Sequence, residues 1–415
     1  MKLFFLLPGL FFSLSTFSYD SYLVKFENPK VKFNFKNKKQ NDFSFRFEDL
    51  NISGSSLGVF YKEEKFSDDS FIKKIKSLPG VEFVEPNYKL HIVENLPDLV
   101  ADPLALSQWG LFGNESINVV KAWEITKGSK NVLIAVVDTG VDYTHPDLQG
   151  QMWVNDAEKN GSPGADDDGN GFIDDIYGYD FANNDGDPMD DHEHGTHCAG
   201  IIGARHNDIG IAGVMGDVGI MAIKFLTSDG MGSTSNAIKA IDYAIKMGAN
   251  ILSNSWGGKF DQESILLEEA IGRARQRGIL FVAAAGNESS NNEVIHNYPS
   301  DYEIGNIISV GSHNGNGGKS SFSNYSKTFV DVFAPGTSIL STALNGKYAT
   351  LSGTSMATPF VAGVAGLLLS QYPQMSYLEI KDRLIKSSAK NGKLDNYSVS
   401  GGRVDAYRAL ENISQ

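Results

Sequence analysis

Four short stretches of this chain carry residues that could together cleave an acyl bond. Ser355, in G-T-S-M-A-T-P, precedes a long uncharged run of small and apolar residues, which predicts a buried helix with a hydroxyl at its positive end. A serine nucleophile needs a base, a group that orients the base, and donors for the oxyanion. His194 in H-G-T-H-C-A-G, Asp138 in V-V-D-T-G and Asn287 in A-A-A-G-N could supply them.

The order of these stretches makes the pattern specific. Alone, G-T-S-x-A would be an ordinary helix cap, and an aspartate after a strand could be a turn residue. The order Asp, His, Ser is one of the known triad orders. In this order, from roughly residue 80 to the C-terminal end, the stretches resemble the subtilases, the subtilisin-like serine endopeptidases, whose substrates are polypeptides.

The resemblance implies a role for each residue. Ser355 would be the nucleophile, His194 the general base and later the general acid, and Asp138 the carboxylate that holds the imidazole tautomer. Asn287 would donate its side-chain amide to the oxyanion, together with the backbone N–H of Ser355. Among eight histidines only His194 occupies the first position of the H-G-T-H stretch, and we expect His197 to be a packed helix residue.

Two segments match those that flank the substrate in the family. Their backbone would pair with an extended peptide by strand addition, so that pockets supply the selectivity. The expected residues are Gly230, Met231 and Gly232 in the first segment, Ser255, Trp256 and Gly257 in the second, and Gly286 beside the oxyanion donor. Trp256 stands where the family commonly has leucine, so the preference of the primary pocket stays open.

An acidic loop between Asp138 and His194 predicts a calcium site. Oxygen-bearing residues recur at relative positions 1, 3, 5 and 9, with glycine at position 6, as in an EF-hand-type loop. Tyr177 stands where the bidentate glutamate belongs, so Asp175 or a remote residue must complete the site. A solvated acidic loop is the alternative. The other expected ligands are Asp166, Asp168, Asn170, the carbonyl of Phe172, and Asp174.

The family resemblance implies a second structural calcium site. Asp102 of the N-terminal arm, Asp147 after a His-Pro pair, and Asn207 in the loop after the histidine helix would meet on one cation. Such a site would tie the arm to the body.

Two other function classes compete with this interpretation. The run from His192 to His197 looks like the ligand run of a metallo-β-lactamase-type zinc hydrolase, but Thr196 replaces the aspartate ligand and H-E-x-x-H is incomplete. A secreted binding protein that has lost catalysis is the second alternative. It is disfavoured because all four catalytic positions are intact.

Composition narrows the choice further. Residues 1–97 carry 14 basic and 12 acidic side chains, whereas residues 98–415 carry 22 and 38, a net charge of −16. This acidic body excludes nucleic acid as a partner and suits cation binding. Because there is one cysteine, Cys198, no internal disulfide can form, and stability must come from packing or bound metal.

Three regions are expected along the chain. Residues 1–18 have a short basic start, an apolar stretch and small residues at the spacing of a signal-peptidase site, which predicts export to the extracellular space or periplasm. An uncleaved anchor is the alternative; once the signal is removed, no membrane association is expected. Residues 19–97 resemble a subtilase propeptide, an intramolecular chaperone and inhibitor, although an unrelated small domain is possible. Residues 98–415 form the expected catalytic domain, a monomer.

Secondary-structure patterns give the expected fold class, α/β. In the body, apolar strands with little polar alternation are separated by helical stretches, which predicts a doubly wound, mostly parallel sheet with helices on both faces. The preceding unit reads as a small α+β domain. Because ligands in doubly wound sheets bind beyond the carboxyl ends of strands, Asp138, Ser255 and Asn287 are expected near one edge of the sheet.

Overall fold

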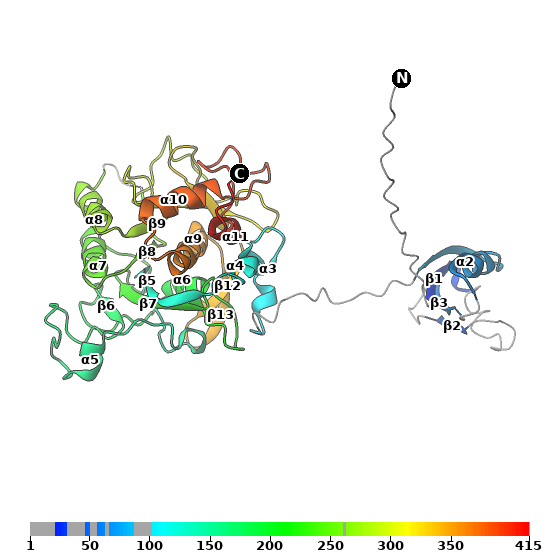
Figure 1. Cartoon of the computed structure of the whole chain (residues 1–415), viewed down its shortest axis with the longest axis horizontal. Helices are drawn as coiled ribbons and strands as arrows, with labels where there is room; N and C mark the ends of the chain where they lie inside the picture. Colours follow the sequence, from blue (N-terminus) through cyan, green and yellow to red (C-terminus); the bar gives the residue numbers. More distant parts are fainter. Residues whose placement is uncertain are drawn as a thin grey trace, which may run out of the picture. The chain divides into compact units, whose positions relative to one another are not determined.

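The chain is seen in a computed structural model that describes residues 21–30, 46–49, 56–62, 66–86, 101–259 and 263–414. It divides into two compact units, Met1–Asn95 and Leu96–Gln415, which are described separately (Figure 1). The signal peptide expected over residues 1–18 lies outside the described residues. None of the helices in the described ranges is both long and apolar enough to cross a bilayer.

The first unit is an antiparallel sheet with one helix against it, the α+β composition expected for it. Its strand order is β2 (Arg46–Asp49), β3 (Leu57–Tyr61), β1 (Ser21–Phe26) and β4 (Val81–Pro86), and the helix is α2 (Asp68–Lys76). Aromatic residues from these elements fill the space between sheet and helix, so this unit has a core of its own. The buried members include Tyr22, Phe26, Phe60, Phe71, Ile75 and Val84.

The second unit is built on a parallel sheet, which confirms the predicted fold class. Every pairing between neighbouring strands of this seven-stranded sheet is parallel. The strand order is β11 (Val332–Pro335), β10 (Ile307–His313), β9 (Leu280–Ala284), β8 (Ile251–Asn254), β5 (Gly128–Asp138), β7 (Asp217–Lys224) and β6 (Gly178–Asp180).

Helices cover both faces of this sheet. Ile134 and Val136 of β5 pack with α6 (His194–Gly203) and α9 (Thr354–Gln371), whereas Ala135 and Val137 pack with α7 (Thr234–Lys246) and α8 (Ile265–Gln276). Figure 1 shows α7 and α8 on one side of the strands and α6 and α9 on the other. Burial on both faces explains why these strands are apolar without alternation.

The strand order reverses beside β5. The chain runs from β5 to β6 and β7 on one side, then returns to β8, β9 and β10 on the other. A crevice opens at such a point, outside the carboxyl ends of the strands. Asp138 is the last residue of β5 and Ser255 directly follows β8, so the topology places both residues at this crevice.

The remaining elements surround this frame. A two-stranded hairpin and two C-terminal helices were not predicted from the sequence. They are β12 (Ile339–Ala343), β13 (Lys347–Leu351), α10 (Tyr377–Lys386) and α11 (Ala406–Leu410). Short helical segments are η2 (Ala105–Ser107), α3 (Trp109–Phe112), α4 (Val119–Ala122), η3 (Pro146–Leu148) and α5 (Asp156–Asn160).

Candidate active site

His194 and Asp138 form a direct hydrogen-bonded pair at the carboxyl edge of the sheet. The distance between Nδ1 of His194 and Oδ1 of Asp138 is 2.7 Å. Asp138 is fully buried, and the same oxygen accepts from the backbone N–H of Thr139. A buried carboxylate bonded to Nδ1 fixes the ring and leaves Nε2 as the basic nitrogen.

Glycine after His194 lets the two elements approach closely. A Cβ at Gly195 would lie 2.1 Å from the carbonyl oxygen of Gly140 and 3.1 Å from Cβ of Asp138. The N–H of Gly195 instead donates to Oγ1 of Thr139 at 2.9 Å. The start of α6 is thereby bonded to the turn that follows β5.

Asp190 was not singled out by sequence reasoning, yet it organises the loop before His194. Its buried carboxylate accepts from the hydroxyl of Thr139 and from the N–H and hydroxyl of Thr196, at 2.6–2.9 Å. It also accepts from the N–H groups of the two residues that precede His194. Only the buried surroundings, which sequence does not give, identify this aspartate among its acidic neighbours.

Ser355 lies in the first turn of α9 and exchanges hydrogen bonds with Ser255. The Ser355 hydroxyl donates to the Ser255 carbonyl at 3.0 Å, and the Ser255 hydroxyl donates to the Ser355 carbonyl at 2.8 Å. The Ser355 carbonyl is available because Pro359, four residues on, has no N–H to donate to it. Proline therefore frees a backbone group that joins the serine to the segment after β8.

The expected hydrogen bond between Ser355 and His194 is not formed in the structure, since the hydroxyl is bonded to Ser255. Ser355, Ser255 and His194 nevertheless lie at one place: Ser255 lines a cavity together with His194, and Sγ of Cys198, one turn after His194, contacts the Ser355 carbonyl at 3.5 Å. Bonds between nucleophile and base often form only in the substrate complex.

Asn287 is oriented by Thr354. Its Oδ1 accepts from the N–H of Thr354 at 2.8 Å and from the Thr354 hydroxyl at 3.0 Å. Both donors fix Oδ1, so the Asn287 amide nitrogen is left to donate elsewhere, and Asn287 and Ser355 line the same cavity of about 150 Å³. Sequence reasoning did not predict this orienting role of Thr354, because nothing in the sequence distinguishes it from the other residues beside the serine.

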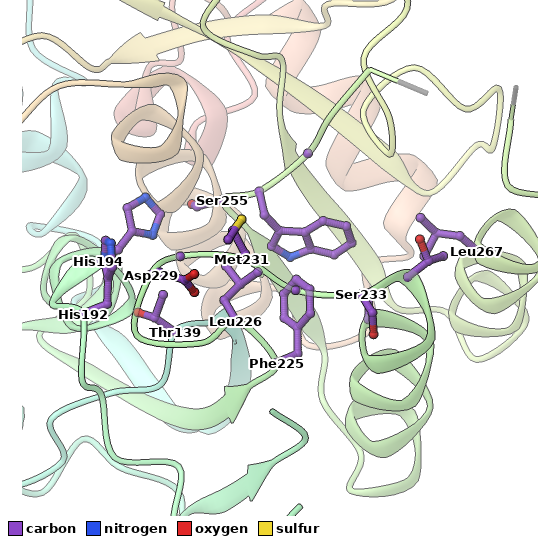
Figure 2. Close-up of a pocket in the computed structure, with 16 residues that line it drawn as sticks. Thr139, His192, His194, Phe225, Leu226, Asp229, Met231, Ser233, Ser255 and Leu267 are labelled. Carbon is purple, nitrogen blue, oxygen red and sulfur yellow. The ribbon is translucent and has the colours of Figure 1, made fainter. Parts of the chain in front are cut away.

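The predicted substrate segments face each other across a cavity of about 570 Å³. Figure 2 shows His192 and His194 at one end of it and Leu267 at the other. The Trp256 ring packs edge-on against Phe225, with 4.9 Å between centroids, and so supplies part of the apolar wall. Residues from both segments line it, namely Gly230, Met231, Gly232, Ser255, Trp256 and Gly257, while Gly286 lines the smaller cavity beside Ser355.

The surroundings shift the pKa values of the two histidines of α6 in opposite directions. Burial by itself lowers the pKa of His194, but the charge and hydrogen bond of Asp138, with a contribution from Asp190, raise it to a net value above 6.5. Burial lowers the pKa of His197 to about 4, and its Nε2 bonds to backbone carbonyls. Burial also raises the pKa of the Cys198 thiol, which therefore stays protonated.

Two of the predicted second-site calcium ligands are buried carboxylates with unsatisfied oxygens. Asp102 and Asp147 are 5% and 0% exposed, and Oδ2 of the first and Oδ1 of the second have no hydrogen-bond partner among the described residues. Burial raises the pKa of both. The backbone N–H of Asn207 donates to Asp102 at 3.1 Å, and Asp147 interacts with the carboxylate of Asp102 and the side chain of Asn207, so the three predicted residues lie close together.

The acidic loop contains one group of converging carboxylates. Carboxylate oxygens of Asp166 and Asp168 lie within 4.8 Å of each other and of Glu158, a buried residue that sequence reasoning missed. The other predicted side chains are also hydrogen-bonded: Asp174 accepts from Gly164, the Asn170 oxygen accepts from the N–H of Phe172, and Asp175 accepts from Asn155, Asn170 and, outside the loop, Tyr243 of α7.

Comparison with known proteins gives a consistent result. Residues 129–401 match the model of the subtilase family. The chain is 38% identical over 343 residues to a thermophilic serine proteinase of Bacillus sp. (strain AK1), covering 82% of this chain and 76% of that protein. It is 39% identical over 301 residues to thermitase of Thermoactinomyces vulgaris, covering 72% and 95%.

A solved structure is also similar. The crystal structure of a cold adapted subtilisin-like serine proteinase matches with a TM-score of 0.53 and 32% sequence identity. The match covers 65% of this chain and 88% of the other.

Proposed function

Because this chain belongs to the subtilase family and is a serine endopeptidase, we propose that Ser355, His194 and Asp138 are its catalytic triad and Asn287 its oxyanion donor. The observation that carries the proposal is the 2.7 Å hydrogen bond between His194 and the buried Asp138. His194 lines the same cavity as Ser255, and Ser255 is hydrogen-bonded to Ser355. Its substrates are polypeptides.

The geometry supports acyl transfer through the serine hydroxyl. With Nδ1–H bonded to Asp138, Nε2 of His194 takes the proton as Oγ of Ser355 attacks the peptide carbonyl carbon. The Ser355 hydroxyl first exchanges its bond to the Ser255 carbonyl for one to His194. His194 then returns the proton to the leaving amine, and water hydrolyses the acyl-enzyme by the same steps.

The experiment that tests the triad is labelling with a fluorophosphonate. One equivalent should react with the wild-type enzyme at Ser355 and none with Ser355→Ala, because only an activated hydroxyl attacks the reagent. A catalytically inactive binding protein would not be labelled. Reaction of Ser355→Ala at the wild-type rate would refute the assignment.

Loss of the oxyanion donor should lower turnover. In Asn287→Leu we expect kcat to fall about a hundred- to a thousandfold with little change in KM, because the amide acts mainly in the transition state, where one donor is worth about 3 kcal/mol. Steady-state kinetics on a chromogenic peptide measure this. Asn314→Leu, in a loop that lines neither cavity, is the control. A loss below tenfold would contradict the role.

The pH profile should report His194. Only neutral imidazole can act as base, so kcat/KM should be constant above the pKa of His194 and fall tenfold per pH unit below it. Since Asp138 and Asp190 raise this pKa, the acidic limb should lie above the 6.5 of free imidazole. Initial rates from pH 4 to 9 measure it. A profile that stays flat to pH 4 would exclude His194 as the base.

We infer further that the enzyme is made as a secreted monomeric precursor. The pattern of residues 1–18 supports export, and the separate aromatic core of the unit containing β1 to β4 supports an independent role for it. Residues 19–97 would then assist folding, inhibit the catalytic domain and be removed by self-cleavage. The N-terminal sequence of the secreted protein tests export and cleavage together.

Calcium is proposed as the structural cofactor. Asp102 and Asp147 fit a cation because their unpartnered buried oxygens need one, and oxygen is the ligand atom that calcium prefers. Glu158, Asp166 and Asp168 offer a second set of converging carboxylates. At either place calcium would supply charge neutralisation and cross-linking of distant segments, without a part in bond cleavage.

A further inference from the structure

A fully buried lysine lies beside the triad and has no role in the mechanism above. Lys224 is the last residue of β7, in register with Asp138 of the neighbouring β5, and its side chain is 1% exposed. Burying an ammonium is costly unless its protons are bonded and its charge is compensated. The ammonium donates to the carbonyls of Thr139 and Leu226 at 2.9 Å and to the Asp191 carboxylate at 2.6 Å.

The three acceptors belong to three different parts of the site. Thr139 follows Asp138 and bonds to the first turn of α6. Asp191 lies three residues before His194, in the loop that leads into that helix. Leu226 lines the cavity of about 570 Å³ near the start of the first substrate segment. One nitrogen atom therefore connects the turn after β5, the histidine loop and the cavity wall.

From these contacts we propose that Lys224 is a positioning residue, whose ammonium holds Asp138, His194 and the substrate cavity in their working arrangement. The inference rests on the triad proposed above. A neutral residue could fill the space but could not donate to three oxygens at once. Misplacement of catalytic groups by about 1 Å can cost a hundredfold in rate, so this connection bears directly on turnover.

The opposite charges of Lys224 and Asp191 give a second, independent readout, the pKa of His194. The titratable groups around His194 are Asp138, Asp190, His192, His197 and Cys198, and the ring centroids of His192 and His194 are 6.3 Å apart. Around Lys224, the further charged group is Asp180 of β6, which pairs with it in register. Lys224 and Asp191 now neutralise each other. Removing the ammonium leaves a carboxylate that favours the imidazolium, and removing the carboxylate leaves a cation that disfavours it.

Three variants of the full chain separate position from charge: Lys224→Met, Asp191→Asn and the double variant. We expect kcat to fall at least about tenfold in Lys224→Met and in the double variant. Asp191→Asn should lower kcat less than Lys224→Met does, because its amide oxygen still accepts from the ammonium. The acidic limb of kcat/KM should move up by about 0.3 pH unit in Lys224→Met, down by about 0.3 in Asp191→Asn, and stay unchanged in the double variant.

Lys381→Met is the matched control. Lys381 of α10 pairs with the buried Asp331 at 3.0 Å and donates to the Ile307 carbonyl, but it lines neither cavity of the site. Its loss should lower thermal stability and leave kcat and the acidic limb as in wild type. Equal effects in Lys224→Met and Lys381→Met would reduce Lys224 to a purely stabilising residue and overturn the proposal.

Titration with the fluorophosphonate gives the concentration of active sites and keeps the two proposals apart. If the wild-type enzyme is not labelled at Ser355, the triad itself fails. If it is labelled while the Lys224 variants keep wild-type kcat and acidic limb per labelled site, only the present inference fails. Should Lys224→Met not fold, Asp191→Ala takes its place, because it removes the acceptor through which the ammonium holds the histidine loop. A fall in kcat per labelled site then supports the proposal, and an unchanged kcat refutes it.

Discussion

Replacing Ser355 by alanine is expected to lower kcat by about six orders of magnitude, the loss typical of removing a nucleophile from a triad. The residual rate would come from the oxyanion donors and substrate binding, which remain in place. Because nucleophile and base act as one unit, His194→Ala should lose nearly as much. The combination of both changes should be no worse than either alone. Rates are measured with a chromogenic peptide after removal of the precursor segment by an unrelated protease that is then inhibited.

The same variant should remain a precursor if processing is autocatalytic. Wild-type protein is expected to begin near residue 98, whereas Ser355→Ala should keep residues 19–97, as read by N-terminal sequencing. Ser352→Ala is the control, because this exposed serine lies three residues earlier and its hydroxyl accepts from the N–H of Ser338, outside the catalytic site. It should process and turn over within about twofold of wild type. Normal processing of Ser355→Ala would separate cleavage of the precursor from the proposed nucleophile.

Much of the fold follows from local sequence because the central strands are buried on both faces. Apolar runs located β8, β9 and the later part of β5, and helical periodicity located α7 and α8 to within a residue or two. The three residues of β6, by contrast, have no pattern of their own, since long-range pairing with β7 makes them a strand. The hairpin of β12 and β13 was also missed, because its second strand is only partly buried.

The site divides in the same way. Ser355, His194, Asp138 and Asn287 could be proposed from sequence because they stand in distinctive motifs, whose neighbouring residues the geometry also requires, as Gly195 shows. Residues whose role depends on their buried surroundings could not be predicted from the sequence. Asp190 and Lys224 look like ordinary charged residues until the structure shows what surrounds them, and Glu158 meets its carboxylate partners only through the path of the acidic loop.

Removal of calcium is expected to lower the unfolding midpoint of the catalytic domain by about 10 °C near pH 8. A cation at a thousandfold excess over its Kd adds about 4 kcal/mol, and each kcal/mol shifts the midpoint of a domain this large by about 2–4 °C. The structural reason is the buried pair of Asp102 and Asp147, whose unpartnered oxygens would otherwise be charged and unsolvated. The measurement compares thermal unfolding in millimolar calcium and in EDTA, using fluorophosphonate-inactivated enzyme to prevent autolysis.

The pH dependence of this effect has a definite sign. Burial raises the pKa of Asp102 and Asp147, so without calcium their contribution to stability is lost as pH rises through those values. The stabilisation by calcium should therefore grow from pH 4 to pH 8. Asp147→Asn should abolish most of it, whereas Asp180→Asn should retain it, because that buried carboxylate accepts from Ala182 and Asn183 of its own turn. Instant loss of activity in EDTA, restored by zinc, would instead favour a zinc hydrolase. Equal unfolding midpoints with and without calcium would show that calcium does not stabilise the domain.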